Sequence, residues 1–443
     1  MNQELSTVQL IVLFYFLASA IATLLLSLPF LHRDNVDLGF LDVFFTAVSA
    51  ISVTGLTVFS TAETFNTAGY FVLAFILQFG GIGIMTLGTF IWILVGKKIG
   101  LKERQLIQID QNRSTLSGLV RVMIKILSTI IIIEIFGTVI LSFYFLSYFS
   151  TWQEAVVQGF FAAVSATTNA GFDITGQSLI PFANDYFVQT VNMLLLILGA
   201  IGFPVLIEVI DYLRGLHGKQ YQFSLFAKLT TVTFFGLIVV GFVLILAFEW
   251  NNFFEGMTWH ESFFYALFQS VTTRNGGLAT MDVAEFTVET QLLLSVLMFI
   301  GASPSSVGGG IRTTTFAIAL LTIYSYAKGN SSIKLFKREI HPEDMVRSFV
   351  VITTAALLCL SSVIILNLSE DFSLVEIIFE VASAFGTTGL SLGITQDLSS
   401  FGKLVIIFLM FVGRIGIFSF LFIIRGKNKA DLFHYPKENI IIG

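Results

Sequence analysis

The sequence predicts an all-α polytopic membrane protein with four tandem helix–re-entrant pore loop–helix repeats around a central pore of pseudo-fourfold symmetry. Three observations support this fold class. Of the 443 residues, 55% are hydrophobic and 12% are charged, so a soluble domain could not hide the apolar surface. Clusters of Lys and Arg separate pairs of apolar runs. Four short glycine motifs recur with a similar spacing.

The apolar runs predict eight spanning helices, two in each repeat, since about 20 apolar residues cross the hydrocarbon core. The first run is too long for a signal-peptide core and lacks basic residues before it, so we expect it to be a membrane helix. The expected spans are 8–30 and 70–95, 122–149 and 184–212, 225–249 and 288–327, and 345–368 and 401–425.

The glycine motifs lie between the two helices of each repeat. They read SAISVTGL (49–56), SATTNAGF (165–172), VTTRNGGL (271–278) and SAFGTTGL (383–390). A run too short to span precedes each motif, and three of these runs begin with capping boxes, at Thr151, Thr258 and Ser373. In the third copy either Gly276 or Gly277 fits the register, and Gly277 is preferred because Leu278 then aligns with the apolar residue that ends the other motifs.

A second glycine pattern lies further along each repeat. Three copies carry two glycines three residues apart, in GGIGIM (80–85), GAIGFP (199–204) and GRIGIF (413–418). The third repeat instead reads GASPSSVGGGIRTTT (301–315), where Pro costs a helix about 3 kcal/mol and each Gly about 1 kcal/mol. We therefore expect this helix alone to be interrupted, with the break lying in the cavity below the glycine motifs.

The basic residues predict the orientation. Of the 24 Lys and Arg residues, 19 fall in four segments, 97–125, 214–228, 328–347 and 425–437. The positive-inside rule predicts that these segments and both termini are cytoplasmic. Each repeat crosses twice, so all copies share one orientation around an axis along the membrane normal. The resulting division is 1–95 for repeat 1, 96–213 for a linker and repeat 2, 214–327 for repeat 3, 328–425 for a linker and repeat 4, and 426–443 for a tail.

Four non-helical segments on one axis are typical of an ion pathway. Irregular backbone at membrane depth is tolerated where it is buried in protein or lines a water-filled cavity. A ring of backbone carbonyls can replace the hydration shell of K⁺, and glycine permits the positive φ angles that such segments need. The motifs contain no carboxylate, which favours selection by carbonyl groups. A single copy would equally suit close helix packing.

These motifs, with GKKIGLKERQ (96–105) and FVGRIGIFSF (411–420), resemble the membrane subunit of Ktr-type potassium uptake systems, in the Trk/Ktr/HKT superfamily. The resemblance implies potassium uptake through a carbonyl filter and an intramembrane gating loop. It also implies a homodimer, an octameric cytoplasmic ring of RCK-type subunits that binds nucleotide, and sodium-stimulated transport. The implied filter residues are Val53, Thr54, Gly55, Asn169, Ala170, Gly171, Asn275, Gly276, Gly277, Thr387, Thr388 and Gly389.

The same resemblance implies that the gate is formed by the break and an intramembrane arginine. We interpret Arg414 as a positive barrier that is hydrogen-bonded to the break, although it would also suit a structural tie between helix ends. Arg274 is expected to anchor the filter backbone or an acidic neighbour, and Arg312 to lie close to the cytoplasmic mouth. The implied gate residues are Gly301, Ala302, Ser303, Pro304, Ser305, Ser306, Val307, Gly308, Gly309, Gly310 and Arg414.

Two other functions were weighed. A sodium-conducting or sodium-coupled relative stays open. An enzyme is disfavoured, because the serines of GASPSS have no intramembrane His or Asp partner and GGGIRTT lacks the Lys-Ser/Thr of a phosphate loop. No cofactor and no nucleic acid is expected; the partners are the lipid bilayer and a soluble subunit. The basic segments 96–105 and 334–347 and the tail 432–443 are its expected docking surface, although their charge alone would also fix the topology.

Overall fold

The computed structural model describes residues 7–34, 36, 38–83, 118–215 and 221–425, and the single positions 436, 438 and 440. The end of the expected 70–95 span, most of the basic segment 97–125 and the tail from 426 lie outside the described ranges. The described chain is almost entirely helical, as expected. Two strands of two residues each, β1 (Lys334–Leu335) and β2 (Arg338–Glu339), pair antiparallel between α14 and α15, a small departure from an all-α fold.

The first helix of every repeat is long and apolar. These helices are α1 (Thr7–Leu26), α7 (Leu119–Phe145), α11 (Leu225–Glu249) and α15 (Pro342–Ser369). In the described ranges they are the four unbroken helices long and apolar enough to cross a membrane. Their exposed side chains include many large apolar ones, such as Phe136 and Leu357, which suits contact with lipid.

A half-helix follows each of them, separated by a short loop. The four half-helices are α2 (Phe40–Ser52), α8 (Trp152–Thr167), α12 (Trp259–Thr272) and α16 (Leu374–Gly386). With 13 to 16 residues each, they are about 20–24 Å long, too short to span. The predicted N-terminal caps are confirmed: Thr151, Thr258 and Ser373 are the N-cap residues of α8, α12 and α16, and the last two form full capping boxes.

The second helix of each repeat begins as α4 (Thr67–Ile82), α9 (Tyr186–Ala200), α13 (Val288–Ile300) or α17 (Ser400–Ile415). The expectation that only the third is interrupted is wrong. Three continue after a break, as α10 (Phe203–Leu213), α14 (Thr313–Ala327) and α18 (Ile417–Arg425), and α4 ends at the matching place. α9 and α10 are bent by 104° at their junction.

The paired glycines explain these breaks. The second glycine of each pair has a left-handed φ, 95° at Gly83, 101° at Gly202 and 88° at Gly416, which ends the helix there. The first glycine has a packing role. A Cβ on Gly80 would lie 2.6 Å from the carbonyl oxygen of Ile51, near the end of α2, so only glycine allows this approach. The first glycine of the pair therefore serves packing, and the second marks the end of the helix.

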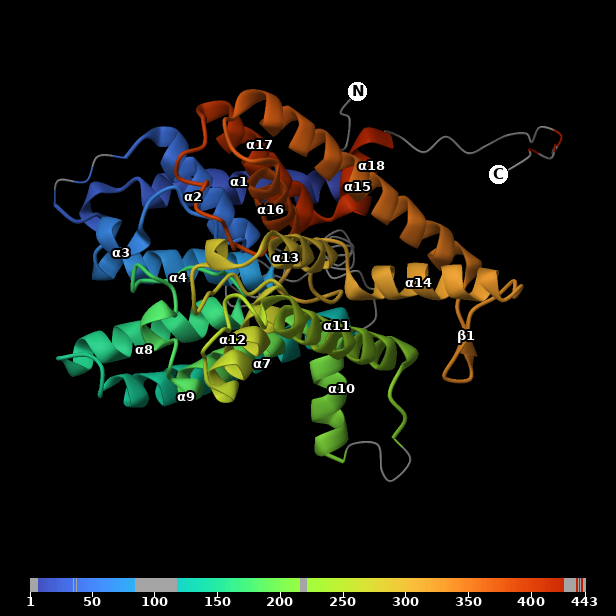
Figure 1. Ribbon diagram of the computed structural model, residues 1–443, viewed down its shortest axis with the longest axis horizontal. Coiled ribbons are helices and arrows are strands. Elements are labelled where there is room, and N and C mark those ends of the chain that lie inside the picture. Colours follow the sequence, from blue (N-terminus) through green and yellow to red (C-terminus); the bar gives the residue numbers. More distant parts are fainter. Residues whose placement is uncertain are drawn as a thin grey trace.

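The repeats form a closed arrangement, in which the first (blue) and fourth (orange to red) lie side by side (Figure 1). α17 packs on α2 across this seam. Shorter elements complete the loops: the helix α3 (Thr61–Thr64) and 3-10 turns at Pro29–Leu31, Ile180–Phe182 and Val283–Glu285. The glycine motifs follow the C-terminal ends of the half-helices and are almost wholly buried.

Candidate functional site

The four glycine motifs meet one another in cyclic order. A Cβ on Gly55 would lie 3.0 Å from the Cα of Gly171, and a Cβ on Gly171 would lie 3.0 Å from the Cα of Gly277. A Cβ on Gly277 would overlap the carbonyl oxygen of Thr388, and one on Gly389 would lie 3.0 Å from the Cα of Gly55. We call residues 53–55, 169–171, 275–277 and 387–389 the glycine segments; their backbones form a closed ring.

Each glycine segment has the same backbone pattern. Its first residue is left-handed, with φ of 57° at Val53, 52° at Asn169, 72° at Asn275 and 53° at Thr387. Its last residue is a glycine with φ of 94°, 69°, 70° or 96° in the same order. This pattern places Gly277, rather than Gly276, in the position that matches the other three. A Cβ on Gly276 would instead meet Thr272 of the preceding half-helix.

Backbone hydrogen bonds turn three segments away from their half-helices in one way. The amides of Thr54, Ala170 and Thr388 donate to the carbonyl oxygens of Ser49, Ser165 and Ser383, over 2.9, 2.8 and 2.9 Å. The third copy differs, since the Gly276 amide donates to Thr272 over 2.6 Å, a turn one residue shorter. The double glycine of RNGGL accommodates this tighter turn.

Serine hydroxyls form hydrogen bonds with two of the glycine segments. Ser49 Oγ accepts a hydrogen bond from the amide of Gly55 over 3.1 Å, and Ser383 Oγ accepts one from Gly389 over 3.0 Å. Both serines lie six residues before their glycine and are fully buried. Each hydroxyl thus satisfies the glycine amide of its own segment and fixes the orientation of that peptide group.

Asparagine side chains join neighbouring segments. Asn169 Nδ2 donates to the carbonyl oxygen of Arg274 over 3.3 Å. Asn275 Nδ2 donates to Thr387, to its carbonyl oxygen over 3.1 Å and to its Oγ1 over 3.0 Å, and also to the carbonyl of Gly386. These bonds tie the second segment to the third and the third to the fourth. Sequence reasoning assigned both asparagines only a backbone role, and their pairing has no local sequence signal.

The break 301–312 lies directly against the ring. A Cβ on Gly308 would lie 2.6 Å from Cγ of Asn275, and one on Gly309 would lie 2.6 Å from Oγ1 of Thr387. Residues 301–310 are all buried except Ser305, which is half-buried. The break is also bound to the second repeat, since the amide of Ser303 donates to Ala200 over 3.1 Å.

Arg414 bridges the break and the first repeat. Its Nη1 donates to the carbonyl oxygen of Val307, and its Nη2 donates to those of Gly80 and Gly81, the latter over 3.3 Å. The side chain is only 7% exposed, and no described carboxylate forms an ion pair with it. The expected hydrogen bond between Arg414 and the break is therefore present, and Arg414 also ties two repeats together.

Arg312 is half-buried and folds back onto the break. Its Nη1 donates to the carbonyl oxygens of Gly308 and, over 3.5 Å, of Ser303. Because Arg312 is the N-cap residue of α14, this contact folds the break back onto the start of the next helix. Arg274 is fully buried and bonds to backbone carbonyls near the end of α13, so it reaches beyond the third glycine segment.

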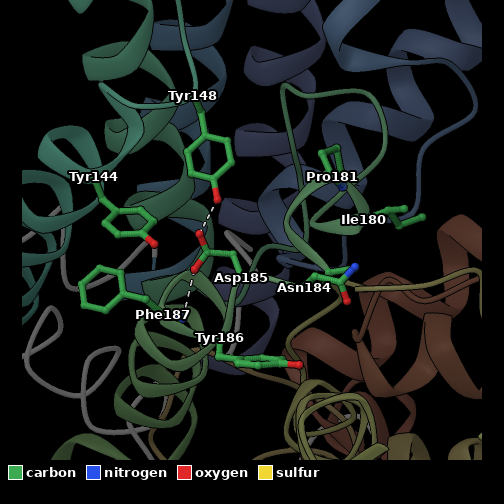
Figure 2. A pocket seen from close by; sticks show the side chains of 9 residues that line it. Tyr144, Tyr148, Ile180, Pro181, Asn184, Asp185, Tyr186 and Phe187 are labelled. Carbon is green, nitrogen blue, oxygen red and sulfur yellow. Dashed lines mark hydrogen bonds between the residues drawn. The ribbon is translucent and has the colours of Figure 1, made fainter. Parts of the chain in front are cut away.

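A separate pocket of about 490 Å³ lies at the face where the half-helices begin, between the end of α7 and the start of α9. In Figure 2 the hydroxyl of Tyr148 points at the carboxylate of Asp185, and both side chains lie at its wall. The Asp185 carboxylate also accepts from the amides of Phe187 and Val188, over 3.0 and 3.1 Å, and so caps α9. None of the residues that line the pocket belongs to a glycine segment, and Tyr148 and Asp185 serve this cap.

Known proteins match nearly the whole of this chain. The sequence profile described as TrkH, cation transport protein, matches residues 6–433. The chain is 58% identical over 441 residues to Ktr system potassium uptake protein D of Bacillus subtilis, covering 100% of this chain and 98% of that protein.

The chain belongs to the TrkH family of cation transport proteins.

Two further similarities agree with this membership. The chain is 34% identical to the potassium/sodium uptake protein NtpJ of Enterococcus hirae, over 100% of this chain and 98% of that one. The crystal structure of the potassium transporter TrkH from Vibrio parahaemolyticus superposes with a TM-score of 0.75 at 20% identity, covering 95% of this chain and 86% of that chain. This member of the TrkH family is thus a Ktr/Trk-type membrane subunit, and the family consists of transporters, which removes the enzyme alternative.

Proposed function

We propose that this chain is the pore-forming subunit of a potassium uptake system of the cytoplasmic membrane. K⁺ passes through a filter made by the backbone carbonyls of the glycine segments. The observation that carries the proposal is the closed ring of Gly55, Gly171, Gly277 and Gly389 contacts. We propose eight spans around this ring with pseudo-fourfold symmetry, two from each repeat: the four long helices, and the four that begin as α4, α9, α13 and α17.

The chemistry of the ring suits a weakly hydrated monovalent cation. Carbonyl oxygens replace water without adding the net charge that would hold the ion too tightly. Each half-helix also ends at its glycine segment, so the partly negative end of its dipole faces the pathway. The side chains that brace the ring are amides and hydroxyls, which keep its backbone shape without introducing a competing charge.

The break 301–312 is proposed to be the gate. It lies against Asn275 and Thr387 of the ring and is held by the guanidinium of Arg414, so it closes the path on the far side of the filter. A buried positive charge in a cation pathway raises the barrier for K⁺ further. Opening therefore requires the break to leave the ring and Arg414 to release the Val307 carbonyl.

Uptake follows from the orientation that the basic segments favour. With the half-helices beginning outside and the broken ends inside, an inside-negative potential contributes about 2.3 kcal/mol per charge for each 100 mV. K⁺ then enters down its electrochemical gradient. Sodium conduction or coupling is a second candidate function, favoured by the relative named as a potassium/sodium uptake protein; sodium-stimulated potassium uptake would reconcile the two.

Regulation is proposed to come from a soluble cytoplasmic subunit, in a ring that binds nucleotide, acting on a homodimer of this chain. The described part of the docking surface is the β1–β2 hairpin and the start of α15, where Lys334, Arg338 and Arg347 lie. This surface continues directly from α14, the helix that follows the break. A partner bound here would thus act on the gate through one rigid helix.

Rubidium uptake into a bacterium that lacks its own potassium uptake tests the proposal. We expect the full chain to support Rb⁺ and K⁺ entry over Na⁺, and deletion of 305–310 to raise the flux or remove its dependence on a partner. Gly236→Ser is the control for expression and membrane insertion. Gly236 is an exposed glycine of α11, and nothing lies within 4 Å of its Cβ position. Sodium entry without Rb⁺ entry would favour the second candidate, and no cation entry would refute both.

A further inference from the structure

Arg274 has an unusual set of partners for a buried charge. It lies immediately before the third glycine segment and is 1% exposed. No described carboxylate forms an ion pair with it. Its Nη2 donates to the carbonyl oxygen of Leu297, and its Nη1 donates to that of Gly301 over 3.4 Å. The last carbonyls of a helix lack helical partners and carry partial negative charge, so this guanidinium caps α13 where the break begins.

The backbone that carries Arg274 is bonded to the ring on its other side. The Arg274 carbonyl accepts from Asn169 of the second segment, and the next residue, Asn275, donates to Thr387 of the fourth. Three glycine segments therefore meet at residues 274–275. The Arg274 side chain therefore links Gly301, at the start of the break, to the point where these segments are joined. The direct packing of Gly308 and Gly309 on the ring lies further along the break.

The other arginines near the break lack this connection. Arg312 donates to the break alone, and Arg414 donates to the break and to the first repeat. Among the arginines in the described part of the chain, Arg274 is the one whose side-chain hydrogen bonds join a residue adjoining a glycine segment to the break. The planar guanidinium is suited to this, since it reaches two carbonyls in fixed directions, which a lysine ammonium on a flexible stem does not.

We propose that Arg274 is a positioning residue that couples the break 301–312 to the glycine ring, so that the state of the break sets the affinity of the ring for its cation. This inference rests on the proposed function. It predicts that gate and filter are not independent in this protein, because coupling between two sites acts in both directions for binding.

A double-mutant cycle tests the coupling. Rb⁺ uptake is measured in potassium-uptake-deficient cells for the wild-type chain, R274Q, the 305–310 deletion and the combination, each normalised to its amount in the membrane. In the wild-type background we expect the deletion to change both the maximal rate and the KM for Rb⁺, the latter about fivefold. In the R274Q background the deletion should change the maximal rate and leave KM within about twofold of its R274Q value.

Two further variants make the test decisive. R312Q also removes a guanidinium from the break but has no link to the ring, so the deletion should still shift its KM. If R274Q does not reach the membrane, R274K takes its place, because it keeps the charge while losing the two-carbonyl geometry; the KM shift should shrink in it as well. An equal KM shift in the wild type and the Arg274 variant, or no shift in the wild type, would overturn the coupling. Absence of Rb⁺ uptake by the wild type would instead refute the proposed function.

Discussion

The Nζ atom of Lys403 lies 2.8 Å from the Oδ1 atom of Asp42, an ion pair that joins α17 of the fourth repeat to α2 of the first. The two side chains are 15% and 34% exposed, so the pair is partly shielded from solvent. Asp42 also lies in the first turn of α2, where the helix dipole favours a negative charge. The pair thus stabilises the seam where the ring of repeats closes.

Replacing Lys403 with Met should weaken that seam. We expect the free energy of unfolding to fall by about 1 kcal/mol, because the pair is less screened than a fully exposed one. The midpoint of thermal unfolding in detergent measures this. Arg347→Met is the matched control, since Arg347 pairs with Glu343 inside one helix and both are well exposed. An equal effect of the two changes would contradict the role of the seam.

Gly55→Ser and Gly171→Ser should each weaken discrimination between K⁺ and Na⁺. At Gly55 a side chain must adopt a φ of 94° and lies 2.6 Å from the carbonyl oxygen of Ala170, so the ring must widen or distort. Competition of Na⁺ with Rb⁺ uptake measures the change, which we expect to exceed about tenfold. Gly236→Ser, placed away from the ring, should leave the ratio unchanged. If both Gly55→Ser and Gly171→Ser kept wild-type selectivity, the assignment of the glycine segments as the filter would be refuted.

Ser383→Ala removes the hydroxyl that accepts from the Gly389 amide. A lost hydrogen bond of this kind costs about 1 kcal/mol, so the relative affinity for Rb⁺ and Na⁺ should change about fivefold. Ser49→Ala should act similarly, because it makes the matching contact in the first repeat. Ser361→Ala is the control, as its hydroxyl donates to the Leu358 carbonyl on an exposed helix surface. Identical selectivity in all three variants would argue against a bracing role.

Arg414→Gln and Arg414→Lys separate a charge barrier from a structural tie. If the positive charge blocks the pathway, the Arg414→Gln variant should show a higher Rb⁺ flux in the absence of a partner subunit, and the Arg414→Lys variant should not. If the bridge from Val307 to Gly80 is what matters, both changes should raise the flux equally, because a lysine cannot reach both carbonyls in the same way. Uptake rates per amount of membrane protein distinguish the two, and no rise in either variant would contradict a gating role.

Tyr148→Phe tests the contact shown in Figure 2. The hydrogen bond to Asp185 raises the pKa of Tyr148 to about 12, with burial and the charge of Asp185 adding to it. Burial raises the pKa of Asp185, but the bonds it accepts from Tyr148 and the Val188 amide leave the pKa below its usual 3.8. The variant should lose up to about 1 kcal/mol of stability at neutral pH, since the tyrosine is half exposed.

The sign of the pH dependence follows from those directions. The raised pKa of Tyr148 means that its contribution is complete below about pH 10 and is lost as pH rises toward 12. The lowered pKa of Asp185 means that its contribution is present above about pH 4 and is lost on acidification. Thermal unfolding of both proteins from about pH 2 to 11 should therefore show a stability difference that is constant near neutrality and narrows at both ends. A gap that grew with alkalinity would refute the assignment.

The features that repeat locally are the ones that could be predicted. The N-caps at Thr151, Thr258 and Ser373 depend on residues three apart, and the first and last residues of the glycine segments follow from one shared motif. The breaks at Gly202 and Gly416 were missed because a glycine pair three residues apart is equally compatible with close packing inside a continuous helix. Only the positive φ of the second glycine distinguishes a helix break from close packing, and a φ angle cannot be read from the amino-acid sequence.

Contacts between repeats were the least predictable. Asn275 reaches Thr387 across 112 residues, and Arg414 reaches Gly80 across 334, so no local pattern points to either pair. For Arg414, burial of a charge is costly, so the sequence predicts hydrogen-bond partners inside the membrane, and the break was the expected partner. The identity of the other partner depended on how the first and fourth repeats meet.

The order of the repeats along one chain has a consequence for biosynthesis. Gly55 contacts Gly389, so the ring acquires its last side only after most of the chain has been made and inserted. An unfinished or truncated chain holds at most three sides of the ring. A nascent chain in the membrane therefore lacks the closed ring, and the Lys403–Asp42 pair, formed later still, stabilises the ring only once its fourth side is present.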